Sequence, residues 1–276
     1  MLSQVVPEYA LLKRLIALSS LIYVFEDNKY TPVLTDDYVR ETYDFVRETC
    51  HITKFVDIER TSFQGFTSIN LKDKEIYVVM RGTEDFRDVV INALFFQARL
   101  DKKDRHIKVH AGFKKQLESC DAAGKLSAEV RRLLTAHPTF SVHVTGHSLA
   151  GALATLLGYR LSKDIPYKYI HVVPIASPRV GNRAFRKSCD EKKNLQILRL
   201  VNANDIATAV PMIGYHHVGA VLKLAATTGN DVEVKVFENY DYDRWREFSL
   251  WNNTSIAAHA IRAYWTNLRK IADNWD

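Results

Sequence analysis

One serine in this chain sits in a sequence context that could make it a nucleophile. Ser148 lies in GHSLA, residues 146–150, after a β-rich apolar run and before a smooth helical run over residues 151–161. A serine hydroxyl attacks a carbonyl only when it is exposed beside a base, with amide donors ready for the oxyanion. A strand–turn–helix context favours this, because the turn exposes the hydroxyl and the helix N-terminus stabilises developing negative charge.

The small residues around Ser148 set how tight this turn can be. Gly146 lets the backbone approach closely where a Cβ atom would clash. The usual form of the turn is G-x-S-x-G, whereas this chain has Ala150 at the last position. We expect alanine to be tolerated there because it is small. The turn alone could equally be an ordinary connection in which Ser148 caps a helix, so a base and an acid are needed elsewhere.

The base should follow the serine and the acid in the chain, because in folds with such a turn the three catalytic residues occur in the order serine, acid, histidine. Of the ten histidines, only His216, His217 and His259 follow any suitable acid. His259 lies in IAAHAI, a small and apolar setting that favours the neutral imidazole a general base requires. His216 and His217 flank the start of a predicted strand, and we expect structural roles for them. His259 is therefore the predicted base.

The predicted acid is Asp205, which directly follows the apolar run 196–201. Asn202 and Asn204 beside it indicate a turn that could orient a carboxylate. An Asp at such a place is also a common helix or turn cap. The competing acids, none of which follows a comparable apolar run, are Asp190, Asp231, Asp241 and Asp243.

Two further histidines lie close to the serine in sequence. His143 is on the apolar run before the turn, and His147 is inside the turn. Both precede the acid, so we expect them to serve packing and backbone hydrogen bonds rather than catalysis.

The elements that must position these residues alternate along the chain. Strands are predicted at 55–58, 63–70, 75–81, 169–175, 196–201, 218–224 and 232–237, in addition to the run before the serine turn. Helices are predicted at about 8–25, 36–48, 114–136, 151–161 and 255–272. This alternation indicates an α/β fold with a mostly parallel central sheet and helices on both faces. No repeat or linker divides the chain, so a single domain over residues 1–276 is expected.

Composition narrows the class of protein. The chain has 276 residues, of which 47% are hydrophobic and 25% charged, as in soluble globular proteins. The net charge of +6 is spread out and does not indicate a nucleic-acid partner, although a weak attraction to anionic lipid is compatible with it. The apolar run 15–25 is 11 residues long, too short for a transmembrane segment.

The cysteines and the N-terminal residues led to an expectation about location. Cys50, Cys120 and Cys189 are isolated, with neither metal-ligand spacing nor a disulfide framework. Glu8 comes early, and no signal-peptide layout is recognisable. We therefore expect no metal and a cytoplasmic protein, with secretion by a non-standard route left open.

Five segments, in order, resemble the class 3 lipase family, whose best-known members are fungal triacylglycerol lipases. They are VMRGT at 79–83, VHAGF at 109–113, GHSLAGALA at 146–154, PRVGN at 178–182 and the stretch 199–211. The resemblance covers about residues 60–265, and five ordered segments are far more specific than one motif. It implies an α/β-hydrolase fold and cofactor-free hydrolysis of carboxylic esters. It also places the nucleophile, acid and base at Ser148, Asp205 and His259.

The same resemblance implies an oxyanion hole and a lid. The oxyanion donors would be Thr83 and Leu149, and a helical lid would follow over residues 84–100. The apolar face of this helix would cover the active site. Alternatively, the segment is a helix packed in the core. Its predicted substrate-facing residues are Phe86, Val89, Val90, Leu94, Phe95 and Phe96. The family usually has Trp at the position of Val89, and the disulfides of its secreted fungal members have no counterpart here.

The expected function is that of a serine hydrolase acting on carboxylic esters of lipids through an acyl-enzyme, as an acylglycerol lipase or esterase. Its partners would be the lipid ester and, transiently, the lipid–water interface. A phospholipase A1 or diacylglycerol lipase could use the same three residues. A catalytically silent lipid-binding module is the alternative from another class. The sequence leaves acyl length, head group and oligomeric state open.

Overall fold

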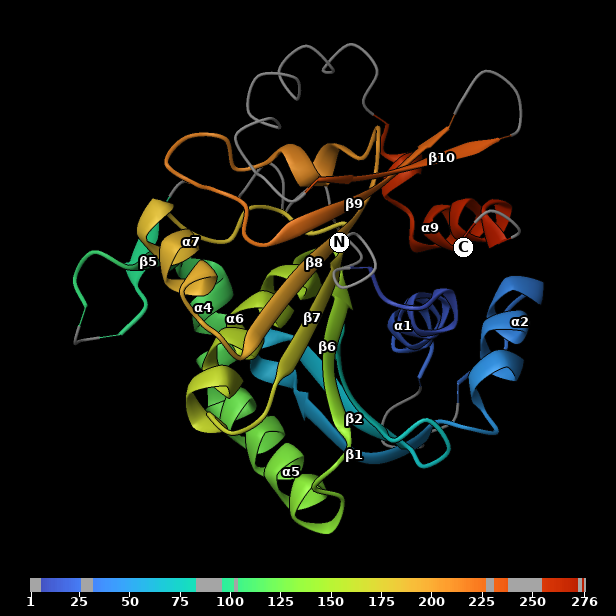
Figure 1. The fold of residues 1–276 in the computed structure, drawn as a ribbon, viewed down its shortest axis with the longest axis horizontal. Helices are drawn as coiled ribbons and strands as arrows, with labels where there is room; N and C mark the ends of the chain where they lie inside the picture. Colours follow the sequence, from blue (N-terminus) through green and yellow to red (C-terminus); the bar gives the residue numbers. More distant parts are fainter. Residues whose placement is uncertain are drawn as a thin grey trace.

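The structure is a computed structural model, and it describes residues 6–25, 32–82, 96–101, 104–226, 231–237, 255–272 and 275. Within these ranges the main sheet has eight strands in the order β1-β2-β3-β6-β7-β8-β9-β10 (Figure 1). The neighbours from β3 to β9 pair in parallel, whereas β1-β2, β2-β3 and β9-β10 pair antiparallel. The prediction of a mostly parallel central sheet is confirmed.

The bounds of the elements are as follows. The strands are β1 (His51–Ile58), β2 (Phe63–Asn70), β3 (Glu75–Met80), β4 (Gln97–Arg99), β5 (Lys108–His110), β6 (Ser141–His147), β7 (Ile170–Ile175), β8 (Leu195–Asn202), β9 (Ala220–Ala226) and β10 (Val232–Phe237). The α-helices are α1 (Tyr9–Leu21), α2 (Asp37–Val46), α4 (Ala111–Glu118), α5 (Ala122–Ala136), α6 (Leu149–Asp164), α7 (Arg183–Asp190) and α9 (Ile261–Lys270). The short 3-10 helices are η2 (Glu59–Thr61), η3 (Ser119–Asp121), η4 (Ile206–Ala209) and η7 (Ala257–His259).

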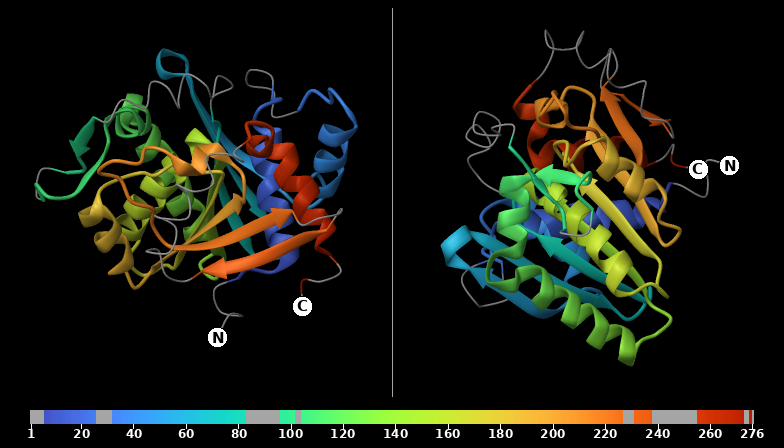
Figure 2. Two further views of the ribbon diagram at one scale, coloured as in Figure 1. Left: turned by 90° about the horizontal axis from the view of Figure 1, so that it is seen from above. Right: turned by 90° about the vertical axis from the view of Figure 1, so that its left-hand side faces the viewer.

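Helices cover both faces of the sheet, which is why its central strands β6, β7 and β8 are buried along nearly their whole length. Helices α4, α5, α6 and α7 lie on one face, and α1, α2 and α9 lie on the other (Figures 1 and 2). Successive side chains of a strand point to opposite faces. In β3, Ile76 and Val78 therefore join the core under α5 and α6, whereas Tyr77 and Val79 join the core under α1.

Two predicted helices are each divided into two shorter helices, although the spacing of their apolar residues is continuous. The helix expected over 114–136 is divided into α4 and α5, because Cys120 (φ 45°) and Asp121 (φ 55°) adopt left-handed backbone conformations. The helix expected over 255–272 is divided into η7 and α9 by Ala260, whose ψ is 133°. Apolar spacing continues across both breaks, so hydrophobic periodicity could not reveal them.

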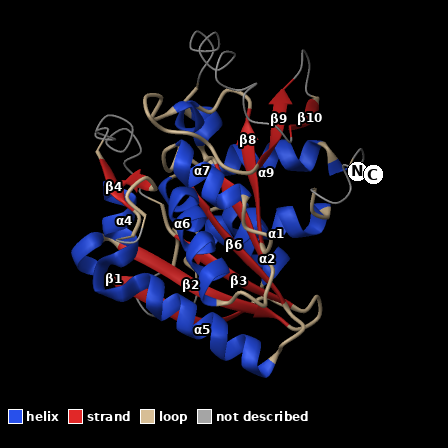
Figure 3. Cartoon of the chain, turned by 60° about the vertical axis from the view of Figure 1, so that its left-hand side comes forward, coloured by secondary structure: helices blue, strands red, loops and turns tan. Residues whose placement is uncertain are grey.

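The turn from β6 into α6 is tight and strained. Ser148 lies between the two elements with φ 62° and ψ −126°, and its N–H donates to Ile175 O at 2.9 Å. A Cβ atom on Gly146 would lie 2.6 Å from the Cβ of Ala150 and 2.8 Å from its carbonyl oxygen. Glycine is therefore required at 146, and the fully buried Ala150 methyl fits only because Gly146 has no side chain. Figure 3 shows β6 and α6 at the centre of the molecule.

We expect Gly146→Ala to lower the free energy of unfolding by about 1–3 kcal/mol, because the added methyl overpacks the turn. Gly65→Ala in β2 is the control, since the atoms nearest to its added Cβ lie farther away, at 3.2–3.3 Å, and two of the three belong to the side chains of Met80 and Phe63. Urea unfolding of both variants measures the difference. Equal losses in the two variants would contradict the tight approach at the turn.

Candidate active site

Three buried side chains form a hydrogen-bonded chain at the C-terminal ends of the parallel strands. Ser148 Oγ lies 2.9 Å from His259 Nε2, and His259 Nδ1 lies 3.0 and 3.1 Å from the two carboxylate oxygens of Asp205. Ser148 follows β6, Asp205 follows β8, and His259 is the last residue of η7. The structure thus brings together the three residues that the sequence predicted.

This arrangement fixes what the imidazole can do. Asp205 is an acceptor when ionised, so the Nδ1 atom of His259 carries the proton and donates to it. The Nε2 lone pair then faces the hydroxyl of Ser148. This lone pair can accept the serine proton while the serine oxygen attacks a carbonyl carbon.

Asp205 is held by two more donors, one of which the sequence did not point to. Its carboxylate accepts from the N–H of Ala207 at 2.8 Å and from the hydroxyl of Tyr264 at 2.6 Å. Burial, and then the Asp205 charge, raises the pKa of Tyr264 well above its usual value, so this hydroxyl stays protonated and donates. The Asn202 N–H donates to the same tyrosine oxygen at 3.0 Å. Tyr264 lies on α9, beyond the unforeseen break after His259, which explains why no spacing signal revealed it.

The short segment that carries His259 is fixed through its backbone. The carbonyl oxygen of His259 accepts from His147 Nε2 at 2.7 Å, and that of Ala258 accepts from Asn202 Nδ2 at 2.9 Å. His147 Nδ1 in turn faces the Tyr23 hydroxyl at 3.3 Å. Burial lowers the pKa of His147 to about 3, so the ring is neutral. The prediction that His147 serves backbone hydrogen bonding is confirmed.

The two competing histidines lie elsewhere. His217 is buried, and its Nε2 donates to the carbonyl oxygen of Thr208 at 2.8 Å. The N–H of His216 donates to Gly181 O at 2.7 Å. The imidazole that reaches Ser148 is that of His259.

The predicted oxyanion site is described in part. Leu149 is the first residue of α6, so its N–H has no partner within the helix. On the other side, a Cβ atom added to Gly82 would lie 2.6 Å from His147 O and 3.5 Å from the Ser148 Cβ. The backbone at Gly82, directly before Thr83, is therefore packed against the serine turn.

Most of the predicted lid lies outside the described residues, together with Thr83. Its described end is not helical as predicted, because Gln97–Arg99 forms strand β4 and pairs with β5. Of its six predicted substrate-facing residues, Phe96 is described, and 71% of it is exposed. The five others, which the structure does not describe, are Phe86, Val89, Val90, Leu94 and Phe95.

Comparison with known proteins decides the family. The family model for Lipase (class 3) matches residues 77–215. This chain belongs to the class 3 lipase family. A lipase from Rhizopus niveus is 34% identical over 65% of this chain and 46% of its own length. A secreted mono- and diacylglycerol lipase from Fusarium solani is 33% identical over 57% of this chain and 46% of its own length. The chain thus spans about half the length of these curated relatives.

Solved structures agree with this assignment. The structure of lipase II from Rhizopus niveus matches with a TM-score of 0.77 and 28% identity, covering 94% of this chain and 94% of that one. The expectation of an α/β-hydrolase fold is confirmed. Among the described residues of this chain, no helix has the length and hydrophobicity of a membrane-spanning segment.

The expectation of a cytoplasmic location is wrong. The Fusarium relative is named as secreted. A phospholipase A1 from Arabidopsis thaliana, 43% identical over 30% of this chain and 19% of its own length, is named as chloroplastic. The expectation relied on the missing disulfide framework and on the absence of a recognisable signal-peptide layout. A core of this size is stable without cross-links, so few cysteines do not specify a compartment.

We expect Tyr264→Phe to shift the acidic limb of the pH–rate profile to higher pH. With one donor fewer, the Asp205 carboxylate is more basic and stabilises the protonated imidazole of His259 more strongly. The free energy of unfolding should also fall by about 1.5–3 kcal/mol, as for a lost hydrogen bond to a charged group. Tyr159→Phe, which removes a hydroxyl paired with Ser188 Oγ, is the control and should leave the pH profile in place. An unshifted profile in Tyr264→Phe would exclude this positioning role.

Proposed function

We propose that this chain is a serine hydrolase that cleaves carboxylic esters of lipids, with acylglycerols as substrates. The observation that carries the proposal is the continuous hydrogen-bonded chain from Ser148 through His259 to Asp205. The class 3 lipase family and the lipase relatives support the same reading.

In the proposed reaction, Ser148 Oγ attacks the ester carbonyl carbon while His259 Nε2 takes its proton. Asp205 stabilises the imidazolium, and the N–H groups of Leu149 and Thr83 bind the tetrahedral oxyanion. The intermediate collapses to an acyl-serine as the leaving alcohol takes the proton from His259. Water, deprotonated by the same imidazole, then attacks the acyl-serine and releases the fatty acid. No cofactor takes part.

The main alternative changes the substrate and keeps the chemistry. A phospholipase A1 or diacylglycerol lipase would use the same residues, and the Arabidopsis relative is named a phospholipase A1. A silent lipid-binding module is disfavoured, because it would not need the serine, imidazole and carboxylate in hydrogen-bonding order. Rates on emulsified triacylglycerol, diacylglycerol and phosphatidylcholine test the choice. Faster cleavage of acylglycerols supports the proposal, and faster cleavage of phosphatidylcholine moves the assignment to phospholipase A1.

We expect Ser148→Ala and His259→Ala to lose ester hydrolysis to a similar extent, on the order of 10⁶ in kcat, because the two groups act as one unit. Steady-state kinetics on a soluble p-nitrophenyl ester measure the loss. His217→Gln is the control, since His217 bonds Thr208 rather than the serine, and it should keep most of the activity. Activity of Ser148→Ala within tenfold of wild type would refute the serine mechanism.

We further propose that a group of exposed apolar side chains contacts the lipid–water interface. Phe96 and Ile213 are 71% and 75% exposed, and Met212 is 38% exposed. They are neighbours, since Gln97 Nε2 donates to Gly214 O at 2.7 Å and the Tyr215 hydroxyl donates to Phe96 O at 3.2 Å. Phe96 is the described member of the six residues predicted to face the substrate.

We expect the double variant Phe96→Asp with Ile213→Asp to lower the rate on an emulsified long-chain ester at least tenfold more than on a soluble short-chain ester. Each charge must be kept from the lipid surface, which costs about 1 kcal/mol or more. Tyr167→Asp is the matched control. Tyr167 is 77% exposed but lies before β7, at the opposite end of the parallel strands. Equal losses on both esters would place the interface elsewhere.

A further inference from the structure

Two side chains of helix α9 reach the segments that carry the acid and the base. Tyr264 and Asn267 are three positions apart, so their side chains lie on the same face of the helix. The Tyr264 hydroxyl donates to Asp205 at 2.6 Å. Asn267 Nδ2 donates to Asn202 Oδ1 at 3.0 Å, and Asn202 is only 2% exposed. The first contact holds the acid, and the second leads through Asn202 to the segment of the base.

The side-chain amide of Asn202 lies between Asn267 and the backbone next to His259. Its Nδ2 atom donates to the carbonyl oxygen of Ala258 at 2.9 Å. A peptide carbonyl can only accept, so the NH2 end of the Asn202 amide must face Ala258, and its oxygen must face Asn267. Asn267 must then present its own NH2 group to that oxygen. The carbonyl of Ala258 thus sets the direction of both hydrogen bonds.

The direction of these bonds depends on the chemistry of residue 267. If the Asn202 amide were reversed, its oxygen would face the carbonyl oxygen of Ala258, and two acceptors would repel each other. An acceptor in place of the Asn267 NH2 group would favour this reversal, because it would bind the NH2 group of Asn202 instead. The donor at position 267 therefore keeps the Asn202 amide in the orientation that holds Ala258.

The carbonyl of Ala258 is directly linked to the position of His259. The C=O group of one residue and the N and Cα atoms of the next lie in one peptide plane, so turning the Ala258 carbonyl moves the Cα atom of His259. At the start of this segment, the Ser255 N–H donates to Asn204 O at 2.8 Å. The Ser255 hydroxyl oxygen accepts from the N–H groups of Ala257 and Ala258 at 3.1 and 3.3 Å. The bond from Asn202 thus holds the peptide plane that leads into His259.

We propose that Asn267 is a positioning residue for the base His259, and that it acts through the Asn202 amide on the peptide plane between Ala258 and His259. The inference rests on the proposed function, since it concerns how His259 Nε2 meets Ser148 Oγ at 2.9 Å. A misplacement of about 1 Å at reacting groups can lower the rate about 100-fold.

Two substitutions of Asn267 separate amide orientation from packing. Asn267→Asp keeps the size but replaces the donor by an acceptor, and it should lower kcat on a soluble p-nitrophenyl ester about 10- to 100-fold with KM unchanged. Asn267→Leu removes the donor without adding an acceptor, so it should lose less. Thr266→Asp, at an exposed position of α9, adds the same charge and should keep the wild-type kcat. Equal losses in the two Asn267 variants would indicate packing and overturn the proposal.

A double-mutant cycle tests whether the effect passes through Asn202. In an Asn202→Ala background, Asn267→Asp should cause no further loss of kcat, because the amide through which it acts is gone. A further loss as large as that in the wild-type background would overturn the proposal.

Proton NMR gives a readout that does not depend on turnover. The Nδ1 proton of His259, hydrogen-bonded to Asp205, is assigned by its absence from the spectrum of His259→Ala. We expect its signal to shift or broaden in Asn267→Asp and to stay in place in Thr266→Asp. An unchanged signal in Asn267→Asp would overturn the positioning role. A wild-type chain that shows this proton but does not hydrolyse esters would instead contradict the proposed function.

Discussion

The close backbone approach between Gly146 and Ala150 is the constraint on which the candidate active site depends. It forces the chain to leave β6 and enter α6 within one residue, and Ser148 takes the positive-φ conformation (φ 62°, ψ −126°) that results. The hydroxyl then points to His259, and α6 begins with the free N–H of Leu149 beside it. The parallel sheet supplies the rest, because the carboxyl ends of its strands lie at one edge, and Asp205 follows β8 there.

Of the three residues, His259 is the one that does not follow a strand of the sheet. A network of hydrogen bonds holds its segment in place instead. His259 lies in a short 3-10 helix, and its position depends on bonds from His147 and Asn202 to the backbone around it. Tyr264 bonds both the Asp205 carboxylate and the Asn202 backbone, and so ties the acid to the same segment.

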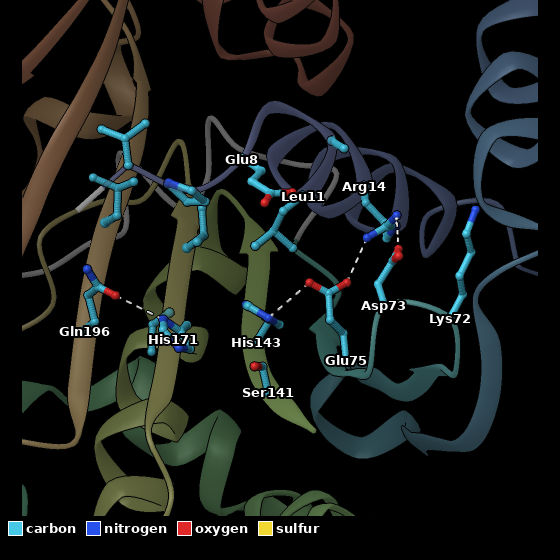
Figure 4. A pocket seen from close by; sticks show the side chains of 16 residues that line it. Glu8, Leu11, Arg14, Lys72, Asp73, Glu75, Ser141, His143, His171 and Gln196 are labelled. Carbon is cyan, nitrogen blue, oxygen red and sulfur yellow. Dashed lines mark hydrogen bonds and ion pairs between the residues drawn. The ribbon is translucent and has the colours of Figure 1, made fainter. Parts of the chain in front are cut away.

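Helix α1 packs along β6. Tyr23, just after its C-terminal end, faces His147 in the serine turn, and Ser19 lies 3.4 Å from Thr145 through their hydroxyl oxygens. Nearer its other end, Arg14 is paired with Asp73 and Glu75 (Figure 4). The same helix therefore contacts the serine turn and the start of β3.

Local signals in the sequence were enough to predict the mostly parallel sheet and to select Ser148, Asp205 and His259, which the structure brings together. A strand–turn–helix around Ser148, and an acid directly after the strand 196–201, depend on neighbours in sequence. Tyr264 could not be predicted, because its bond to Asp205 depends on the break at Ala260, which leaves the apolar spacing unchanged. Thr83 and the lid stay predictions. The location was inferred wrongly because cysteine content reports on cross-links and not on compartment.

Fluorophosphonate labelling followed by peptide mass analysis tests the central claim most directly, since the reagent reacts with a serine activated by a neighbouring base. We expect the phosphonyl group on Ser148 alone, with labelling slowed by orders of magnitude in His259→Ala. Labelling of another residue, or equal labelling rates in wild type and His259→Ala, would contradict a nucleophile at Ser148 activated by His259.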